Sequence, residues 1–399
     1  MSNKKAIIIS IIISAVAAGS TAWCFRGLYD IFVHKDLYTK VAGIERVLDS
    51  EFLYDYDEEK LADYAALGMT MGLEDPYTVY YNKQQFTQYT DDAGGNFIGI
   101  GITVVWNKEA DEIEVISVMD NSPGKEAGIL PGDVIVGVEN DRYTGSQMNE
   151  AVSRIKGTEL ENPENTSVNI IVRRKDKEMD LTLVRKRIHQ KTITCSMDGK
   201  DIGIIRISAF NTASKEGEKS TDEEFKDAIC ELTQKGMKKL IIDLRDNGGG
   251  DLGSVSEIID MIVPEGLIMY TEDKHGNREE LTSDKNELNI PMAVIVNGNS
   301  ASASELLTGA LKDYNKAEII GTKTFGKGVM QAIYPFSDGS GMVVTIAKYF
   351  TPGGTCVQDE GITPDITCEL PEELKDTPIT SIPRNKDIQL QTAIDFLNK

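Results

Sequence analysis

The sequence is poor in the residues that build most metal centres. It holds three histidines and five cysteines in 399 residues, and no two cysteines stand at a CxxC spacing. No zinc site can therefore be recognised, and the strand–turn–helix pattern of a phosphate-binding P-loop is missing as well. We expect buried free thiols, although secretion would permit a disulfide between two of the last four cysteines. The five are Cys24, Cys195, Cys230, Cys356 and Cys368.

Positive charge is also scarce. Lys and Arg together number 42 against 64 Asp and Glu, which gives a formal net charge of −22. An acidic surface of this size repels phosphate backbones, so nucleic acid is excluded as a partner. We interpret the charge as a well-solvated surface.

Long apolar runs are absent except for one at the start of the chain. Residues from Ala6 to Phe25 form a stretch of 20 without a charge, which is close to the length that spans a bilayer as a helix. Lys4 and Lys5 precede it, so the positive-inside tendency places the N-terminus in the cytoplasm and everything after Arg26 outside. A cleaved signal peptide is the alternative, because the run is rich in small residues towards its end. We predict an uncleaved single-pass anchor in the cell membrane.

The expected secondary structure changes along the chain, and these changes divide it into five predicted parts. They are an anchor or signal (1–27), a helical region (28–92), a mostly β domain (93–187), an α/β core (188–371) and a linker with a last helix (372–399). The helical region carries an amphipathic stripe, typical of core or of a partner face, at Val41, Ile44, Val47 and Leu48. In the core, apolar strands alternate with helices, which indicates sheet layers against helices.

The small β domain carries a recognisable motif. Residues 122–135 read SPGKEAGILPGDVI, and they follow a glycine-interrupted strand. About sixty residues with this pattern resemble a PDZ domain of the bacterial secreted-protease type. Such a domain binds a peptide end as an added strand, and the resemblance implies that glycine-flanked amides capture the terminal carboxylate. The residues predicted for this are Ile98, Gly99, Ile100 and Gly101; by itself, this stretch would be equally typical of a strand bulge.

A serine-rich segment follows one buried strand of the core. Residues 294–305 read VIVNGNSASASE, which predicts a strand, a tight turn and the start of a helix. A hydroxyl at a helix N-terminus can act as a nucleophile, with the next backbone N–H holding an oxyanion. Helix capping by serine is the ordinary alternative.

A lysine between two glycines is the second feature. Residues 322–331 read TKTFGKGVMQ, and the tract around Lys327 is otherwise apolar or small. An amine can take a proton from serine only if its pKa falls, and burial lowers the pKa by disfavouring the charged form. A surface lysine in a glycine turn is the alternative.

Together the two segments resemble the C-terminal processing, or tail-specific, peptidases, over nearly the whole chain after the anchor. The resemblance implies a ClpP/crotonase-like α/β core, Ser302 as nucleophile, Lys327 as base and Gln331 as the residue that orients the lysine. Ser300 and Ser304 are the alternative nucleophiles.

A third segment, IIDLRDNGGG at 241–250, resembles the oxyanion turn of the same family. By this resemblance Gly248 or Gly249 donates one N–H to the oxyanion and Ala303 donates the other. Gly248 stands where many relatives have proline, so the turn is expected to be looser. Shorter segments that resemble the family occur at 73–77, 348–354 and 361–365.

The sequence therefore predicts a bacterial, extracytoplasmic serine endopeptidase that recognises substrate C-termini and needs no cofactor or metal. Its partners would be proteins or peptides with free C-termini, and the resemblance implies a homodimer. Three alternatives remain: a silent PDZ scaffold, a His-Asp-Ser protease and an acyl-CoA enzyme. The second would need His34, His189 or His275 in a catalytic setting, whereas His275 is predicted at a hairpin tip.

Overall fold

The computed structural model describes residues 35–158, 160, 163–213, 218–375 and 377–399. Its contacts divide the chain into two units, Met1–Ala65 and Ala66–Lys399. The predicted anchor at 6–25 lies outside the described residues. In the part of the chain that is described, no helix has both the length and the apolar character needed to cross a membrane.

The described part of the first unit is mostly helical. It contains α2 (Lys35–Glu51) and the start of α3 (Glu58–Met71). No residue of α2 is buried, and Val41, Ile44 and Val47 of the predicted stripe are 45%, 55% and 59% exposed. This stripe therefore packs against nothing within the described unit.

The helical region predicted over 28–92 contains one strand that the prediction missed. The chain forms a short strand, β1 (Val79–Tyr81), and then α4 (Lys83–Ala93), which begins at a capping box formed by Asn82 and Gln85. β1 is a strand because it pairs with β18, with Val79 opposite Val343. A partner more than two hundred residues away leaves no trace in the local sequence.

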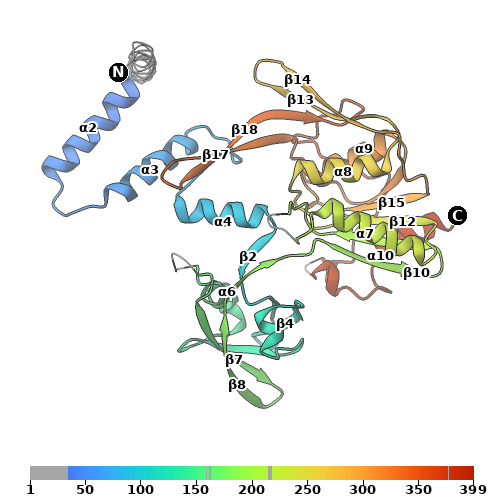
Figure 1. The fold of residues 1–399 in the computed structure, drawn as a ribbon, viewed down its shortest axis with the longest axis horizontal. Coiled ribbons are helices and arrows are strands. Elements are labelled where there is room, and N and C mark those ends of the chain that lie inside the picture. The colour runs from blue at the N-terminus through green and yellow to red at the C-terminus, as the bar shows by residue number, and fades with distance from the viewer. Residues whose placement is uncertain (1–34, 159, 161–162, 214–217, 376) are drawn as a thin grey trace, which may run out of the picture. The chain divides into compact units, whose positions relative to one another are not determined.

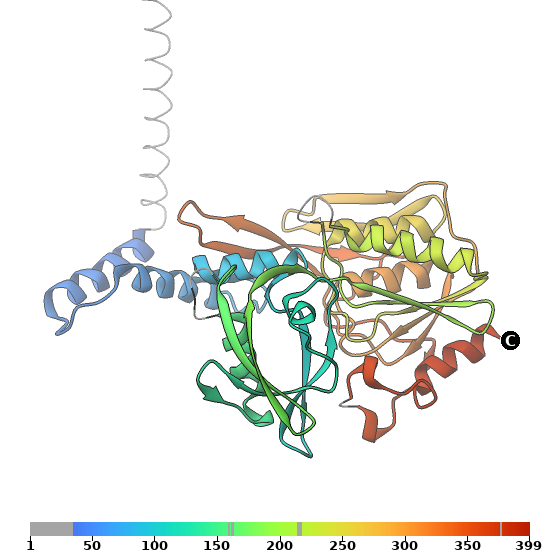
Figure 2. The same cartoon turned by 60° about the horizontal axis from the view of Figure 1, so that its bottom comes forward.

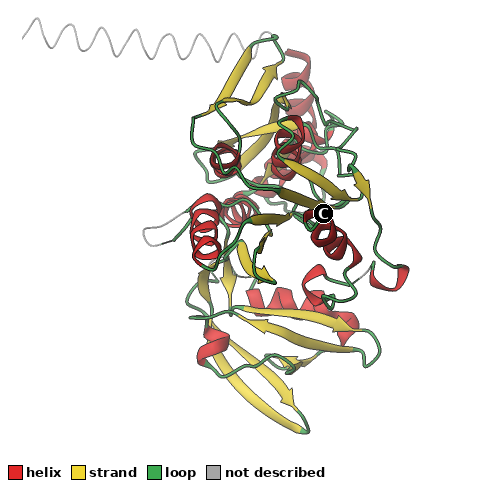
Figure 3. Ribbon diagram, turned by 90° about the vertical axis from the view of Figure 1, so that its right-hand side faces the viewer, coloured by secondary structure: helices red, strands yellow, loops and turns green. Residues whose placement is uncertain are grey.

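The PDZ-like domain is mostly strand, as Figure 3 shows at the bottom of its view. Its main sheet has the order β3-β4-β5-β7-β8, with β6 beside β5, and β2 pairs with β9. The strands are β2 (Asn96–Gly99), β3 (Ile102–Asn107), β4 (Glu112–Val118), β5 (Val134–Val138), β6 (Asp141–Arg142), β7 (Ser167–Arg174), β8 (Lys177–Val184) and β9 (Lys186–His189). The helices are α5 (Pro123–Glu126), η1 (Gly145–Gln147) and α6 (Met148–Lys156). The predicted glycine-interrupted strand is divided into β2 and β3, because Gly101 turns the chain at φ +71°.

The central sheet of the core has the order β10-β11-β12-β15-β16-β19. All neighbours are parallel except β10 and β11. Its strands are β10 (Ile193–Asp198), β11 (Ile202–Ile207), β12 (Lys239–Asp243), β15 (Met292–Val296), β16 (Ala317–Gly321) and β19 (Ile366–Thr367). Parallel strands covered on both faces read as continuous apolar runs, and β15 is buried at every position.

Helices cover both faces of this sheet. α7 (Thr221–Gln234), α8 (Leu252–Ile262) and α9 (Ala303–Asp313) pack on one face, where Leu240, Ile242 and Val294 point. α7 and α8 lie side by side in Figure 1. α10 (Ile388–Leu397) packs on the other face against Ile241 and Ile295, as Figure 2 shows with α10 in red.

A second sheet lies beside the helices. It contains β13 (Gly266–Asp273), β14 (Arg278–Ser283), β17 (Val329–Pro335) and β18 (Gly341–Phe350), together with β1. β13 and β14 form the hairpin with His275 in its tip, as the sequence predicts. Two short turns, η2 (Glu372–Leu374) and η3 (Ile379–Ser381), precede α10.

The cysteines within the described residues are free thiols, but they are not buried. Cys230 is exposed, and Cys195, Cys356 and Cys368 are partly exposed. The prediction of free thiols is confirmed for these four, and the prediction of burial is wrong.

Candidate active site

Ser302 lies at the end of the turn that joins β15 to α9. Its backbone has φ +55° and ψ −116°, a conformation that a side-chain-bearing residue rarely adopts, and it immediately precedes the first residue of α9. Strain of this kind is typical of a residue whose side chain must be presented in a fixed direction. The N–H of the following Ala303 has no acceptor in the described part of the chain, as expected in the first turn of a helix.

The two neighbouring serines are placed differently. Ser300 and Ser304 are fully buried, and their hydroxyls donate to the carbonyl oxygens of Leu244 and Asn247 at 2.8 and 2.9 Å. Both therefore fasten the serine turn to the loop after β12. Of the three serines, Ser302 is the one that lines a cavity.

Lys327 lines the same cavity, ahead of β17. Burial lowers the pKa of its amine, and the carboxylate of Asp75 opposes this by favouring the charged form. The Lys327 Nζ lies 4.9 Å from the centre of the Tyr77 ring, a cation–π contact. A lysine in this setting is more easily deprotonated than one in water.

Asp75 and Tyr77 come from the loop before β1, far from the lysine in sequence. Burial disfavours the charge of Asp75, but hydrogen bonds from the Thr78 hydroxyl at 2.6 Å and the Tyr77 N–H at 3.1 Å hold its pKa below the usual value. In the sequence, this segment is recognisable only as a short stretch that resembles the family. Its contact with Lys327 depends on the pairing of β1 with β18, which sequence reasoning missed.

Glu305 connects the serine turn with the lysine loop. Its fully buried carboxylate accepts four hydrogen bonds, from the Ser302 N–H (2.9 Å), the Lys327 N–H (2.8 Å), the Gly326 N–H (2.7 Å) and the Thr324 hydroxyl (2.6 Å). The hydroxyl of Tyr349 adds a second link, because it lies 3.0 Å from the Ser302 carbonyl and 2.9 Å from that of Lys327. Two loops separated in sequence are thus fixed to one another by satisfied buried groups.

The glycine turn after β12 approaches this point closely. A Cβ on Gly249 would lie 2.8 Å from the Cβ of Ser302 and 3.0 Å from the Ala303 nitrogen, so only glycine leaves room beside that N–H. The Gly249 N–H donates to the side-chain oxygen of Asn247 at 2.9 Å, whereas the Gly248 N–H has no acceptor among the described residues. A small space with free amides therefore adjoins Ser302.

A buried ion network fixes the base of that turn. Arg245 is 1% exposed and forms two hydrogen bonds each with Asp243 (2.8 and 2.9 Å) and Asp387 (both 2.8 Å). Burial alone would lower the pKa of Arg245, but the two carboxylates raise it above its ordinary value. Since Asp387 caps α10, the last helix of the chain is joined to the turn that carries Gly248 and Gly249.

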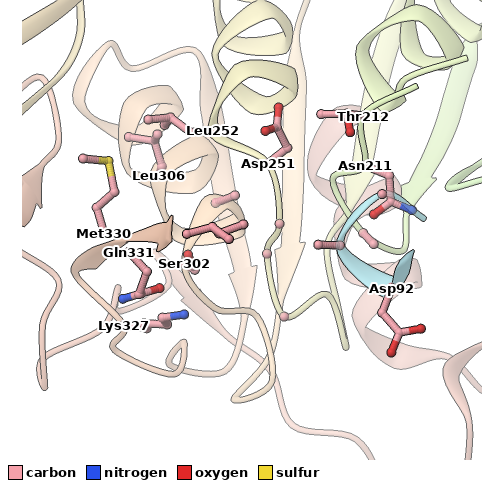
Figure 4. Close-up of a pocket in the computed structure, with 18 of the residues that line it drawn as sticks. Asp92, Asn211, Thr212, Asp251, Leu252, Ser302, Leu306, Lys327, Met330 and Gln331 are labelled. Atoms are coloured by element: carbon pink, nitrogen blue, oxygen red, sulfur yellow. The ribbon is translucent and has the colours of Figure 1, made fainter. Parts of the chain in front are cut away.

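Ser302, Lys327 and the glycine turn line a cavity of about 840 Å³. Figure 4 shows Ser302, Lys327 and Gln331 together at one side of it, and Asp92, Asn211 and Thr212 at the other. Leu252, Leu306 and Met330 add apolar lining on the same side as Ser302. The Gln331 Nε2 atom is buried and has no hydrogen-bond partner in the described structure. The cavity can hold an extended peptide segment against a hydroxyl, an amine and free amides.

The residues predicted to capture a carboxylate lie apart, in the PDZ-like domain. Ile98 and Gly99 end β2, opposite Arg187 and Lys186 of β9, and Ile100 is buried. Gly101 approaches Ser122 so closely that a Cβ would lie 2.3 Å from its side chain. The next strand, β3, pairs only with β4 among the described strands, so its other edge is free to accept an added strand.

A metal site is not found among the described residues, because no three His, Cys, Asp or Glu side chains gather in a suitable group. His189 and His275 lie in the β9 strand and in the hairpin tip, and neither lines the cavity. His34 lies outside the described residues.

Comparison with known proteins agrees with this arrangement. The family model "Peptidase family S41" matches residues 201–368, and the PDZ domain model matches residues 88–169. A Staphylococcus aureus (strain N315) protein described as a probable CtpA-like serine protease is 36% identical over 337 residues, which cover 84% of this chain and 65% of that protein. The chain therefore spans slightly less than two thirds of that relative.

Two further relatives extend the comparison. A Staphylococcus saprophyticus protein with the same description is 33% identical over 360 residues, covering 89% of this chain and 70% of the relative. A solved Bacteroides fragilis protein assigned to the S41 proteases shares the fold, with a TM-score of 0.56 and 15% identity over 88% of this chain and 92% of its own. The chain belongs to peptidase family S41 and carries a PDZ domain.

Proposed function

We propose that this protein is a serine endopeptidase that cuts peptide bonds with a Ser302–Lys327 dyad. The observation that carries the proposal is the cavity in which Ser302 and a partly buried Lys327 lie together, tied by the shared carboxylate of Glu305. Neutral Lys327 takes the Ser302 proton, and the Ser302 oxygen attacks the peptide carbonyl. The protonated amine then gives a proton to the leaving amine, and water releases the acyl-enzyme.

The developing negative charge on the carbonyl oxygen needs donors. The Ala303 N–H provides one, and the glycine turn provides the other through Gly248 or Gly249. Because Gly249 already donates to Asn247, the Gly248 amide is the one open in this conformation. Gln331 orients Lys327 through its side-chain amide oxygen, which can accept a hydrogen bond from the amine; Figure 4 shows the two side chains beside one another.

The PDZ domain recognises substrate C-termini in this proposal. Residues 98–101 hold the terminal carboxylate, and the free edge of β3 accepts the peptide as an added strand. We further propose a ClpP/crotonase-like core and an anchor at 6–25 that places the catalytic part outside the cytoplasm. A homodimer completes the proposal.

The test is cleavage of an unstructured protein with an apolar C-terminus by the chain from Leu28 on. The parent should cut, whereas Ser302→Ala and Lys327→Ala should be inactive with unchanged melting temperatures. Lys323→Ala is the matched control, because Lys323 is exposed in the same loop and should be dispensable. A chelator should leave activity intact. An inert parent that still binds the peptide end would instead favour a PDZ scaffold.

A further inference from the structure

Strand β17 has one edge without a partner strand. It pairs with β18 from Val329 to Pro335 and with no other strand in the described structure. Such an edge presents a row of N–H and C=O groups that can pair with another extended chain. β17 begins two residues after Lys327, so its edge starts at the catalytic base.

The register shows which residues face outward. The Tyr349 N–H donates to the Gly328 carbonyl at 3.0 Å, and at the other end the Phe336 N–H donates to the Ser340 carbonyl at 2.8 Å. In an antiparallel ladder, alternate residues bond the partner strand. Even-numbered residues of β17 therefore bond β18, and the main-chain groups of Val329, Gln331 and Ile333 point away from it. The register shift beside Met330 adds a residue to β18, not to β17, so the alternation along β17 is unbroken.

These outward-facing residues also line the catalytic cavity. Val329, Gln331 and Ile333 all belong to the lining that contains Ser302. The next outward position, Pro335, has no N–H to donate and ends the usable edge. The free edge thus extends for about five residues along the cavity.

We propose that the outer edge of β17 is the strand on which the substrate main chain docks. An extended polypeptide segment pairs with Val329, Gln331 and Ile333 and is thereby laid past the hydroxyl of Ser302. This rests on the proposed function of the site and adds how its substrate is held. Since main-chain groups make the contact, the cleft selects for an unfolded segment and tolerates varied side chains.

The test measures binding apart from cleavage. The probe is a fluorescein-labelled, unstructured peptide with an amidated C-terminus, so that the PDZ carboxylate loop has no ligand. Its affinity for the Ser302→Ala protein is read by fluorescence anisotropy. Ile333→Pro in this background removes one outward N–H and no bond to β18, whereas Ile333→Ala removes only the side chain. We expect proline to weaken binding roughly tenfold beyond alanine; equal affinities of the two variants would overturn the proposal.

A series of modified peptides makes the test independent of whether the Ile333→Pro variant folds correctly. Single N-methyl groups are placed at successive residues of the probe, which is bound to the Ser302→Ala protein. Pairing with β17 predicts weakening at every second residue, and a uniform or absent effect contradicts it. Cleavage of the unmodified peptide by the parent is scored separately. If the peptide binds with the alternating pattern but is never cut, the proposed docking on β17 is supported and the proposed endopeptidase activity is contradicted.

Discussion

Lys327 is subject to two opposing influences on its basicity. Burial lowers the pKa of its amine, while the Asp75 charge and the Tyr77 ring favour the ammonium form. A general base works best when its pKa lies near the operating pH. Asp75 therefore keeps the amine from becoming too weak a base once it is buried.

The pH dependence of cleavage should reveal this balance. Asp75→Asn removes the negative charge that raises the pKa of Lys327, so this pKa falls further. The neutral fraction of the lysine then persists to lower pH, and the acid limb of the kcat/KM profile should move to lower pH. The measurement is that profile for the parent and for Asp75→Asn. Asp120→Asn, at a side chain 88% exposed in the PDZ domain, should leave the limb in place. A limb that moves to higher pH would contradict the role of Asp75.

The glycine turn provides a second test at single residues. Gly249→Ala places a Cβ within 3.0 Å of the Ala303 nitrogen and strains a backbone at φ +102°. It fills the space where the carbonyl oxygen would lie, so kcat should fall by about 10²–10³-fold, the usual cost of a lost oxyanion donor. Gly248→Ala meets no atom within 4 Å and keeps its N–H, so its kcat should stay close to that of the parent. Similar losses in both variants would place the oxyanion elsewhere.

Among the elements, those with a strong local pattern were predictable from sequence. β12 and β15 appeared as apolar runs because both faces of a parallel sheet are covered. β1 was missed, and the edge position of β17 was not foreseen, since both features depend on pairing with β18.

In the candidate site, too, contacts between segments far apart in the sequence could not be predicted. Ser302 and Lys327 were named because each stands in a short motif. Asp75 and Tyr77 reach Lys327 through the packing of β1, and the four hydrogen bonds of Glu305 join loops that only tertiary structure brings together. The two proposed reacting groups could therefore be named from the sequence, whereas most of the contacts that hold them in place could not.

Helix α10 should matter to stability through one side chain. Asp387 caps the helix and pairs with the buried Arg245, so Asp387→Ala removes two of the five side-chain hydrogen bonds of that guanidinium. Breaking a buried pair from one side costs about 3–5 kcal/mol in the free energy of unfolding. Urea denaturation should show this loss. Asp395→Ala, an exposed position on the same helix, should change the value by less than about 0.5 kcal/mol.

At the scale of the whole molecule, α2 presents an apolar stripe that nothing in its own unit covers. Val41 and Ile44 are 45% and 55% exposed on a helix with no buried residue. Full burial of such a side chain is worth about 1.5–3 kcal/mol, and covering the half that is exposed here would contribute about half of that. A second copy of the chain offers the same stripe, so two helices can cover one another, in keeping with the proposed homodimer.

Sedimentation of the chain from Leu28 on tests this association. The parent should sediment as a dimer at micromolar concentration, and the double variant Val41→Glu, Ile44→Glu should be monomeric, because a charge in the stripe would have to be buried without a partner. Thr39→Glu adds a charge on the opposite side of the same helix and should leave the dimer intact. If the parent is a monomer, the stripe is covered by something other than a second copy. If instead the double variant remains dimeric, the contact lies elsewhere on the chain, and α2 is left as a spacer between the proposed anchor and the catalytic unit.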